Sequence, residues 1–238
     1  PKNLDEFVGQ ESILANNSLL RNAILDDKVG NIIFSGPPGV GKTTLIEIIS
    51  SNTRSALVKL NAVLSSIKEL RNEISNAKER LISTNRKTIL FIDEVHRFTA
   101  VQQDALLPSI ENGTITFIGA TTENPFFAVN KALISRARVF SLLPLSENDL
   151  QKIIEKVINY YACLQDSKTI KITQEAITHL TKFSGGDARN LINALEFGIS
   201  ITKENKDKLI VIDLQIAEDS IQKKNIVYDK SGSILLVC

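Results

Sequence analysis

The sequence lacks several features that would place a protein in a special class. It contains no methionine and only two cysteines, Cys163 and Cys238, which are far apart and lack CxxC spacing. This pattern favours reduced thiols in a cytosolic protein. We expect neither a membrane-spanning helix nor a signal peptide, because no apolar run is long enough to cross a bilayer. A chain that starts at Pro1 and has no methionine is expected to be a fragment of a longer protein.

The sequence also lacks a strong excess of either charge. It has 28 lysine and arginine residues against 27 aspartate and glutamate residues, which leaves a formal net charge of +1. A net charge this small excludes strong electrostatic attraction of nucleic acid by the molecule as a whole, so contact with DNA would need a local basic patch. Apolar residues make up 43% of the chain, and 238 residues are enough for one large domain or two small ones.

The most specific motif lies between two apolar runs, where residues 36–43 read GPPGVGKT. They fit the pattern G-x-x-x-x-G-K-[ST], in which backbone N–H groups and the lysine contact phosphate and the Ser/Thr hydroxyl binds Mg²⁺. A chance match in a chain of this length has odds of about 1 in 100. A surface turn rich in glycine and proline would not explain Lys42 and Thr43 at a helix start. The predicted nucleotide-binding residues are Gly36, Pro37, Pro38, Gly39, Val40, Gly41, Lys42, Thr43 and Thr44.

Short apolar runs alternate with helical patterns in the first part of the chain. Residues 66–84 have the apolar spacing of an amphipathic helix. Continuous apolar strands are typical of a parallel sheet that helices cover on both faces. The pattern predicts a doubly wound α/β domain with a five-stranded parallel sheet, whose ligand lies at the carboxyl ends of the strands. The expected strands are 31–35, 56–60, 88–92, 114–120 and 139–143.

The pattern changes at Pro144, the start of a predicted hinge that extends to Ser146. No convincing strand follows before Lys208, and helices are expected near 147–162, 174–183 and 188–200. Residues 210–212 fit either a strand or the apolar entry to a helix. The predicted regions are an α/β domain over 1–143, a small all-α lid over 144–208 and the start of a C-terminal helical region over 209–238.

Asp93 and Glu94 follow the strand predicted over 88–92. Next to a phosphate loop, Asp93 is suited to orient the hydration shell of Mg²⁺ together with Thr43, and Glu94 to polarise the attacking water. The alternative is a pair of acids that caps the next helix. The phosphate loop favours the catalytic interpretation.

Other candidate residues have structural alternatives of similar weight. Thr122 follows the fourth strand, where its hydroxyl is suited to contact water or the γ-phosphate, but a turn-forming threonine explains it nearly as well. Arg189 lies in the first turn of a helix that Asp187 is expected to cap, where an arginine is unfavourable to the helix dipole. This favours a role for Arg189 at the γ-phosphate. Arg136 and Arg138 are expected to be exposed; such arginines are usually solvated, although a ring-forming ATPase uses one as a finger in its neighbour's site.

Two further segments remain open or without a predicted role. Residues 4–10 and the helical stretch at 19–24 fit either a segment that folds over the nucleotide base or one that only packs. His96 and His179 have no cysteine or acidic companions at metal-ligand spacing, so no zinc site is predicted.

Together these motifs resemble those of an AAA+ ATPase over roughly residues 4–200. GPPGVGKT resembles the Walker A motif, ILFIDE Walker B, GATT sensor 1, SRAR an arginine-finger box and GDAR sensor 2. More narrowly, the chain resembles the family of replication-associated recombination protein A and of the Werner-helicase-interacting ATPases. The segments that carry this resemblance are DEVHRF, QQDALLPSIENGTITFIGATTENP, SRARVF and GGDARNLINALE.

The resemblance implies an ATPase that uses ATP and Mg²⁺ and depends on single-stranded, gapped or forked DNA. It implies a tetramer, association with single-strand-binding protein, and a cytoplasmic, nucleoid-associated location without membrane attachment. It also implies a helical lid and a later oligomerisation domain. The residue roles that it implies are catalysis by Glu94, Lys42, Thr122, Arg136 and Arg189, metal binding by Thr43 and Asp93, nucleotide binding by Arg189, and contact with adenine by Val8 and Gly9.

One segment departs from the family, and three competing functions stay open. Ser231–Cys238 does not match the family's continuation, which in the family leads into the oligomerisation domain. Self-assembly of this chain is therefore open, and we expect weak turnover where no neighbour supplies Arg136. A clamp-loader-like or adaptor subunit would use ATP binding to drive assembly on a partner. A branch-migration motor would need a winged-helix module, and none is visible. A nucleotide-binding but inert piece is the simplest alternative.

Overall fold

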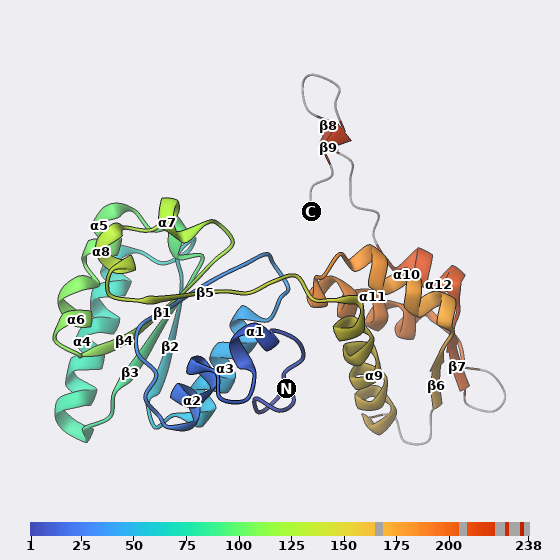
Figure 1. The fold of residues 1–238 in the computed structure, drawn as a ribbon, viewed down its shortest axis with the longest axis horizontal. Helices are drawn as coiled ribbons and strands as arrows, with labels where there is room; N and C mark the ends of the chain where they lie inside the picture. Colours follow the sequence, from blue (N-terminus) through green and yellow to red (C-terminus); the bar gives the residue numbers. More distant parts are fainter. Residues whose placement is uncertain (165–168, 205–208, 222–226, 229–233, 236–238) are drawn as a thin grey trace. The chain divides into compact units, whose positions relative to one another are not determined.

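The computed structural model describes residues 1–164, 169–204, 209–221, 227–228 and 234–235 (Figure 1). Its contacts divide the chain into two compact units, Pro1–Leu143 and Pro144–Cys238. Each unit has a hydrophobic core of its own. No helix of the described residues is long and apolar enough to cross a membrane.

The first unit is built on a five-stranded sheet in the order β2-β3-β4-β1-β5, and every pair of neighbours is parallel. This confirms the predicted doubly wound sheet. In the register, Ser35 at the end of β1 pairs with Thr121 at the end of β4, so the carboxyl ends of the central strands share one edge. The strands are β1 (Ile32–Ser35), β2 (Ala56–Asn61), β3 (Thr88–Asp93), β4 (Ile115–Thr121) and β5 (Arg138–Ser141).

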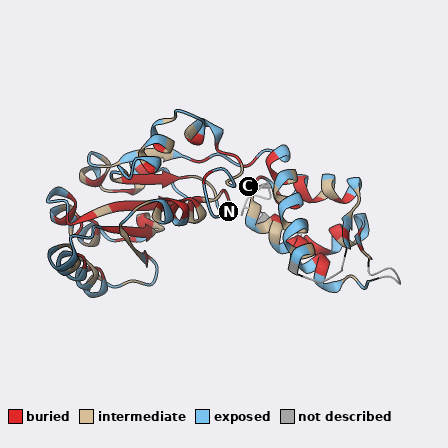
Figure 2. Cartoon of the chain, turned by 90° about the horizontal axis from the view of Figure 1, so that it is seen from below, coloured by how far each residue is buried: buried red, intermediate tan, exposed pale blue. Residues whose placement is uncertain are grey.

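Helices cover both faces of this sheet, because successive side chains of a strand point to opposite sides. Phe34 packs in one core with Leu45 of the helix after β1, whereas Ile33 packs in the other core with Leu70 of α4 (Ile67–Thr84). The three inner strands β1, β3 and β4 are almost entirely buried, whereas the edge strands β2 and β5 are partly exposed (Figure 2). The helical elements are α1 (Glu11–Leu14), α2 (Leu19–Leu25), α3 (Lys42–Asn52), α4 (Ile67–Thr84), η1 (Val95–Arg97, a 3₁₀ turn), α5 (Ala100–Asp104), α6 (Leu107–Glu111), α7 (Pro125–Ala128) and α8 (Lys131–Ile134).

The second unit is mainly helical, as expected, but it is not all-α. Two strands of four residues, β6 (Thr169–Ile172) and β7 (Leu209–Ile212), form a parallel pair at its edge. The prediction missed β6 because its apolar residues are too few to stand out, whereas pairing with β7 buries Ile170 and Ile210 in the helical core. The helices are α9 (Glu147–Leu164), α10 (Gln174–Ser184), α11 (Ala188–Ile201) and α12 (Leu214–Ser220).

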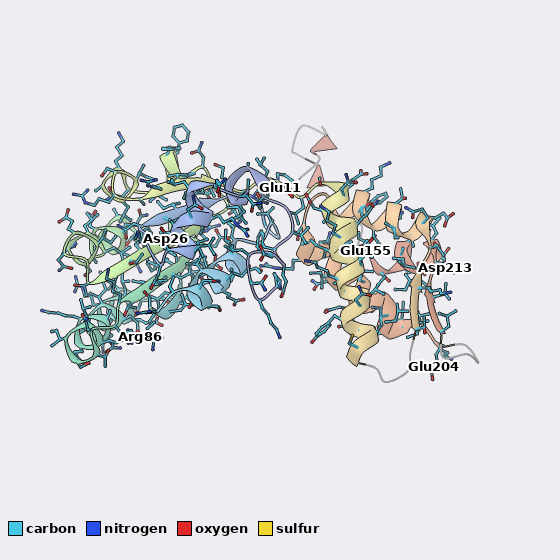
Figure 3. The ribbon with its side chains drawn as sticks, turned by 60° about the horizontal axis from the view of Figure 1, so that its bottom comes forward. Glu11, Asp26, Arg86, Glu155, Glu204 and Asp213 are labelled. Carbon is cyan, nitrogen blue, oxygen red and sulfur yellow. The ribbon has the colours of Figure 1, made fainter. Side chains whose placement is uncertain are left out.

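The predicted boundary between residues 208 and 209 is therefore wrong. Of the two predicted alternatives for residues 210–212, a strand or the start of a helix, the strand is correct. These residues pair with β6 instead of starting a separate region. Helix α12 follows directly: the side chain of Asp213, labelled in Figure 3, accepts a hydrogen bond from the backbone N–H of Ile216. Ala217 of this helix lies in the same core as α9–α11.

The end of the chain contributes one further pair of strands. β8 (Val227–Tyr228) and β9 (Ile234–Leu235) are antiparallel. Most of Ser231–Cys238, the segment that departs from the family pattern, lies outside the described residues.

Candidate active site

The loop between β1 and α3 has a backbone that requires glycine at two of its motif positions. Gly36 has φ +151°, and a Cβ there would lie 2.4 Å from the carbonyl oxygen of Leu142. Gly41 has φ +99°, and a Cβ there would lie 2.7 Å from Cζ of Phe7. These φ values are rare for residues with side chains, and both close approaches exclude a Cβ. The spacing of the motif is therefore explained by the loop that it forms.

Lys42 places a buried positive charge inside this loop. It is the first residue of α3 and only 8% exposed, and its Nζ donates to the carbonyl oxygens of Gly36 at 2.6 Å and Pro37 at 2.8 Å. The N–H groups in the first turn of an 11-residue helix have no acceptor within the helix, and they add a partial positive charge at the same place. A cation, a helix N-terminus and a loop with glycine at its two tightest positions fit a phosphate group.

Thr43 and Thr44 follow Lys42 in the first turn of α3, and both are partly buried. Asp93 is the last residue of β3, which is two strands from β1 in the sheet order. Its carboxylate lies at the same edge of the sheet as the phosphate loop. The backbone N–H of Gly36 donates to the carbonyl oxygen of Thr121 at 3.2 Å, which ties the loop to the intervening strand β4. A hydroxyl and a carboxylate are the oxygen ligands that suit Mg²⁺, so Thr43 and Asp93 fit the metal that the motif implies.

Glu94 has a left-handed backbone, with φ 52° and ψ 46°. For a residue with a side chain this conformation costs about 1–3 kcal/mol, and such strain is concentrated at functional sites. Glu94 precedes η1 but makes no capping hydrogen bond with its side chain. The alternative in which this acid caps the next helix is therefore wrong.

The carboxylate of Glu94 instead contacts the loop after β4. Its Oε2 accepts from the hydroxyl of Thr122 at 3.2 Å and from the backbone N–H of Thr122 at 3.4 Å. Thr122 is exposed, and its side chain faces the predicted water-activating residue rather than forming a local turn bond. Glu94 and Thr122, which follow different strands in the sequence, are therefore in direct contact in the structure.

His96 is a residue of this site that the sequence analysis missed. Its side chain is 5% exposed, with Nδ1 3.3 Å from Glu94 Oε2 and Nε2 3.3 Å from Glu123 Oε1. These contacts have no counterpart in the sequence spacing, because Glu123 follows a different strand from Glu94 and His96. The signal in the sequence was the position of His96, two residues after Glu94.

A cavity opens between the phosphate loop and the loop after β4. Its volume is about 430 Å³, which is within the range of small-molecule sites. It is lined by Ser35, Gly36, Pro37, Thr122, Glu123, Asn124, Pro125, Phe126 and Ser141.

The N-terminal segment packs against the phosphate loop. Gln10 is buried, and its side-chain amide donates to the carbonyl oxygen of Leu143 at 2.8 Å and of Val40 at 3.5 Å. The side-chain oxygen of Gln10 accepts from the backbone N–H of Leu143 at 3.0 Å. These bonds hold the preceding residues, Val8 and Gly9, beside the loop. Their contact with adenine stays a prediction.

The three candidate arginines differ in their surroundings. The guanidinium of Arg136 pairs with Glu111 of α6, with Nη2–Oε1 2.5 Å and Nε–Oε1 2.9 Å, and its side chain is 38% exposed. Arg138 is the exposed first residue of β5. Arg189 is exposed on α11 of the second unit, next to Asp187, whose side chain caps the helix through the N–H of Asn190 at 3.0 Å. The roles of Arg136 and Arg189 stay predictions.

Comparison with known families defines the class of protein. The ATPase family associated with various cellular activities (AAA) matches residues 32–145, and the AAA C-terminal domain matches residues 166–234. Among solved structures, the RuvB Holliday junction branch migration motor of Thermotoga maritima has a TM-score of 0.70 at 26% identity, and the match covers 98% of this chain and 75% of that chain. The fold of the chain and its phosphate loop are those of an AAA+ ATPase.

Relatives narrow this class to a family. Replication-associated recombination protein A of Haemophilus influenzae and that of Escherichia coli K12 are each 38% identical over 232 residues, or 98% of this chain and 52% of each protein. ATPase WRNIP1 of Dictyostelium discoideum is 37% identical over 247 residues, or 98% of this chain and 28% of that protein. The chain belongs to this family of AAA+ ATPases, as the motifs predicted. It spans about half the length of the bacterial relatives.

Proposed function

We propose that this chain is the ATP-hydrolysing part of a DNA-dependent ATPase that acts in replication and recombination. Use of ATP is supported by the match to the AAA family. Action on DNA is supported by relatives whose names describe replication-associated recombination. The observation that carries hydrolysis is the placement of Glu94, in a strained backbone conformation, with Oε2 3.2 Å from the hydroxyl of Thr122.

Each residue at the sheet edge has a task that suits its chemistry. Lys42 and the N–H groups at the start of α3 bind and neutralise the β- and γ-phosphates. Glu94 orients a water molecule and draws its proton towards the carboxylate. The Thr122 hydroxyl contacts the γ-phosphate or the attacking water, and Thr43 with Asp93 holds Mg²⁺. The metal, when bound, spreads the negative charge that develops on the phosphate oxygens.

Residues farther from the phosphate loop complete the proposed cycle. Val8 and Gly9 border the adenine, and Arg189 of the second unit contacts the γ-phosphate. Arg136 acts in the site of a neighbouring copy, so a dilute chain turns over slowly. In the assembled protein we expect a tetramer that binds single-stranded, gapped or forked DNA together with single-strand-binding protein, in the cytoplasm at the nucleoid.

The DNA part of the proposal predicts that DNA raises the steady-state rate of ATP hydrolysis. The measurement compares single-stranded, gapped, forked and blunt duplex DNA of equal nucleotide concentration, at saturating ATP. We expect the rate to rise with single-stranded, gapped or forked DNA and to change less with blunt duplex. A rate that none of these substrates changes, measured on assembled protein, would contradict the DNA part and leave ATP hydrolysis standing.

The role of Glu94 predicts a separation of binding from turnover. Glu94→Gln keeps the shape and the contact with Thr122 but cannot take a proton, so we expect turnover to fall about 100-fold. ATP affinity, measured by equilibrium binding of a fluorescent analogue, should stay within about twofold, because the phosphate loop is unchanged. Glu79→Gln, at an exposed acid of α4, is the matched control and should keep normal turnover. Normal turnover by Glu94→Gln would refute the assignment.

The same variant distinguishes the proposed enzyme from an adaptor. An adaptor subunit needs only ATP binding to assemble on its partner, so it would keep ATP-dependent partner binding with glutamine at residue 94. A DNA-remodelling enzyme would lose its output on DNA together with hydrolysis. Pull-down of single-strand-binding protein in the presence of ATP, beside the DNA-stimulated rate, separates the two.

A further inference from the structure

His96 lies against the acid that the proposed reaction needs. It is the middle residue of η1, and its imidazole is almost completely enclosed, with 5% of the side chain exposed. One ring nitrogen, Nδ1, is 3.3 Å from Oε2 of Glu94 and 2.8 Å from the hydroxyl oxygen of Thr121. The other, Nε2, is 3.3 Å from Oε1 of Glu123. The ring therefore connects the end of β3 with both ends of the turn Thr121–Glu123.

The partners of the ring fix its orientation. Thr121 is fully buried, and its hydroxyl oxygen accepts from the backbone N–H of Glu123 at 3.0 Å while it faces Nδ1 of His96. A carboxylate faces each ring nitrogen, so Glu123 is an acceptor for a proton on Nε2 and Glu94 is an acceptor for a proton on Nδ1. A ring held at both nitrogens in this way cannot turn without breaking contacts on two strand ends.

The two carboxylate oxygens of Glu94 differ in the number of groups that they contact. Oε2 faces three groups, which are the hydroxyl of Thr122, the N–H of Thr122 and Nδ1 of His96. No hydrogen bond or ion pair from the part of the chain that the structure describes reaches Oε1. A carboxylate that is anchored by one oxygen keeps the other in a fixed direction, which is what a base for an attacking water requires.

We propose that His96 is a positioning residue for Glu94, which it holds in the orientation that activates water. The proposal rests on the proposed function of Glu94. His96 does not touch the phosphates; it acts through Glu94 and through the Thr121–Glu123 turn. Partners of this kind typically change activity by about 10- to 100-fold when they are removed.

Two amide substitutions separate the roles of the two ring nitrogens. The amide nitrogen of asparagine lies near the place of Nδ1, whereas that of glutamine lies near the place of Nε2. We expect His96→Asn to keep most of the turnover, because it can still reach Glu94. His96→Gln should lower kcat about 10-fold and leave ATP affinity within about twofold. If both variants turn over at the wild-type rate, or if both lose ATP affinity in parallel with kcat, the proposal is wrong.

A double-variant cycle tests whether His96 acts through Glu94. If it does, Glu94→Gln combined with His96→Gln should be no slower than Glu94→Gln alone, because the positioned base is already lost. A general loss of structure would instead multiply the two effects. His179→Gln, at the other histidine, which stacks on Phe183 in the second unit, is the matched control and should leave kcat unchanged.

The outcomes keep this proposal distinct from the proposed function. Full turnover by Glu94→Gln would refute Glu94 as the base and the role of His96 with it. An inactive Glu94→Gln together with a normal His96→Gln would refute only the role of His96. A readout without turnover is the ¹⁵N NMR shift of the His96 ring, which should move in Glu94→Gln while that of His179 does not. An unchanged His96 shift would contradict the contact itself.

Discussion

Replacement of Lys42 by alanine is expected to lower ATP turnover about 1,000-fold or more and to weaken ATP binding. Loss of one preorganised donor to developing charge costs about 100- to 1,000-fold in rate. Lys42 also supplies the cation that binds the β- and γ-phosphates, so the loss of affinity adds to the loss of rate. The measurements are steady-state phosphate release and equilibrium binding of ATP at fixed Mg²⁺.

Two further variants make this result specific. Lys42→Arg keeps the charge, but its larger planar group does not fit a site where the lysine is 8% exposed and bonded to two carbonyl groups, so we expect it to be inactive as well. Lys59→Ala removes an exposed lysine that pairs with Glu47 of α3 at 2.6 Å, and it should retain full turnover. A Lys42→Ala variant within tenfold of the wild-type rate would show that the loop does not bind the reacting phosphate. Thermal unfolding checks that the carbonyl groups of Gly36 and Pro37 do not destabilise the variant when they lose their donor.

Replacement of Arg136 by alanine is expected to lower the turnover of assembled protein about 1,000-fold, which is the lower end of the range for arginine fingers. ATP affinity should change little, because this arginine is proposed to act in the site of another copy. Arg138→Ala is the matched control, and it should retain turnover if Arg136 alone is the finger. The reverse result would assign the role to Arg138.

Action between copies can be shown by mixing two inactive variants. Arg136→Ala has an intact phosphate loop, and Lys42→Ala has an intact finger. At protein concentrations where copies associate, a mixture places some intact loops next to intact fingers, so part of the turnover should return. Turnover of the mixture that only equals the sum of the two variants would contradict action between copies. The same role predicts that the specific rate of the wild-type chain rises with protein concentration.

The central sheet and the phosphate loop could be predicted because their signals are local. Strands such as β3 are buried on both faces and therefore read as continuous apolar runs, and the loop is defined by glycines whose conformation no other residue adopts readily. Asp93 and Glu94 could be placed at the sheet edge because they directly follow such a strand. The location of the main site thus follows from short stretches of sequence.

The parts that could not be predicted depend on contacts between distant residues. Strand β6 forms only because it pairs with β7, which lies across two intervening helices in the sequence. The pair Arg136–Glu111 and the contact between His96 and Glu123 join residues of different elements, and no periodic pattern marks either of them. The left-handed backbone of Glu94 is likewise set by its surroundings, since glutamate has no preference for it.

The hydrogen bonds of Gln10 have a mechanical consequence. One side chain bonds to Val40 of the phosphate loop and to both backbone groups of Leu143, the last residue of the first unit. The loop, the N-terminal segment and the point where the chain leaves this unit therefore cannot shift separately without breaking hydrogen bonds of the buried Gln10 side chain. Gln10 therefore ties the phosphate loop to Leu143, the residue after which the chain continues into the second unit.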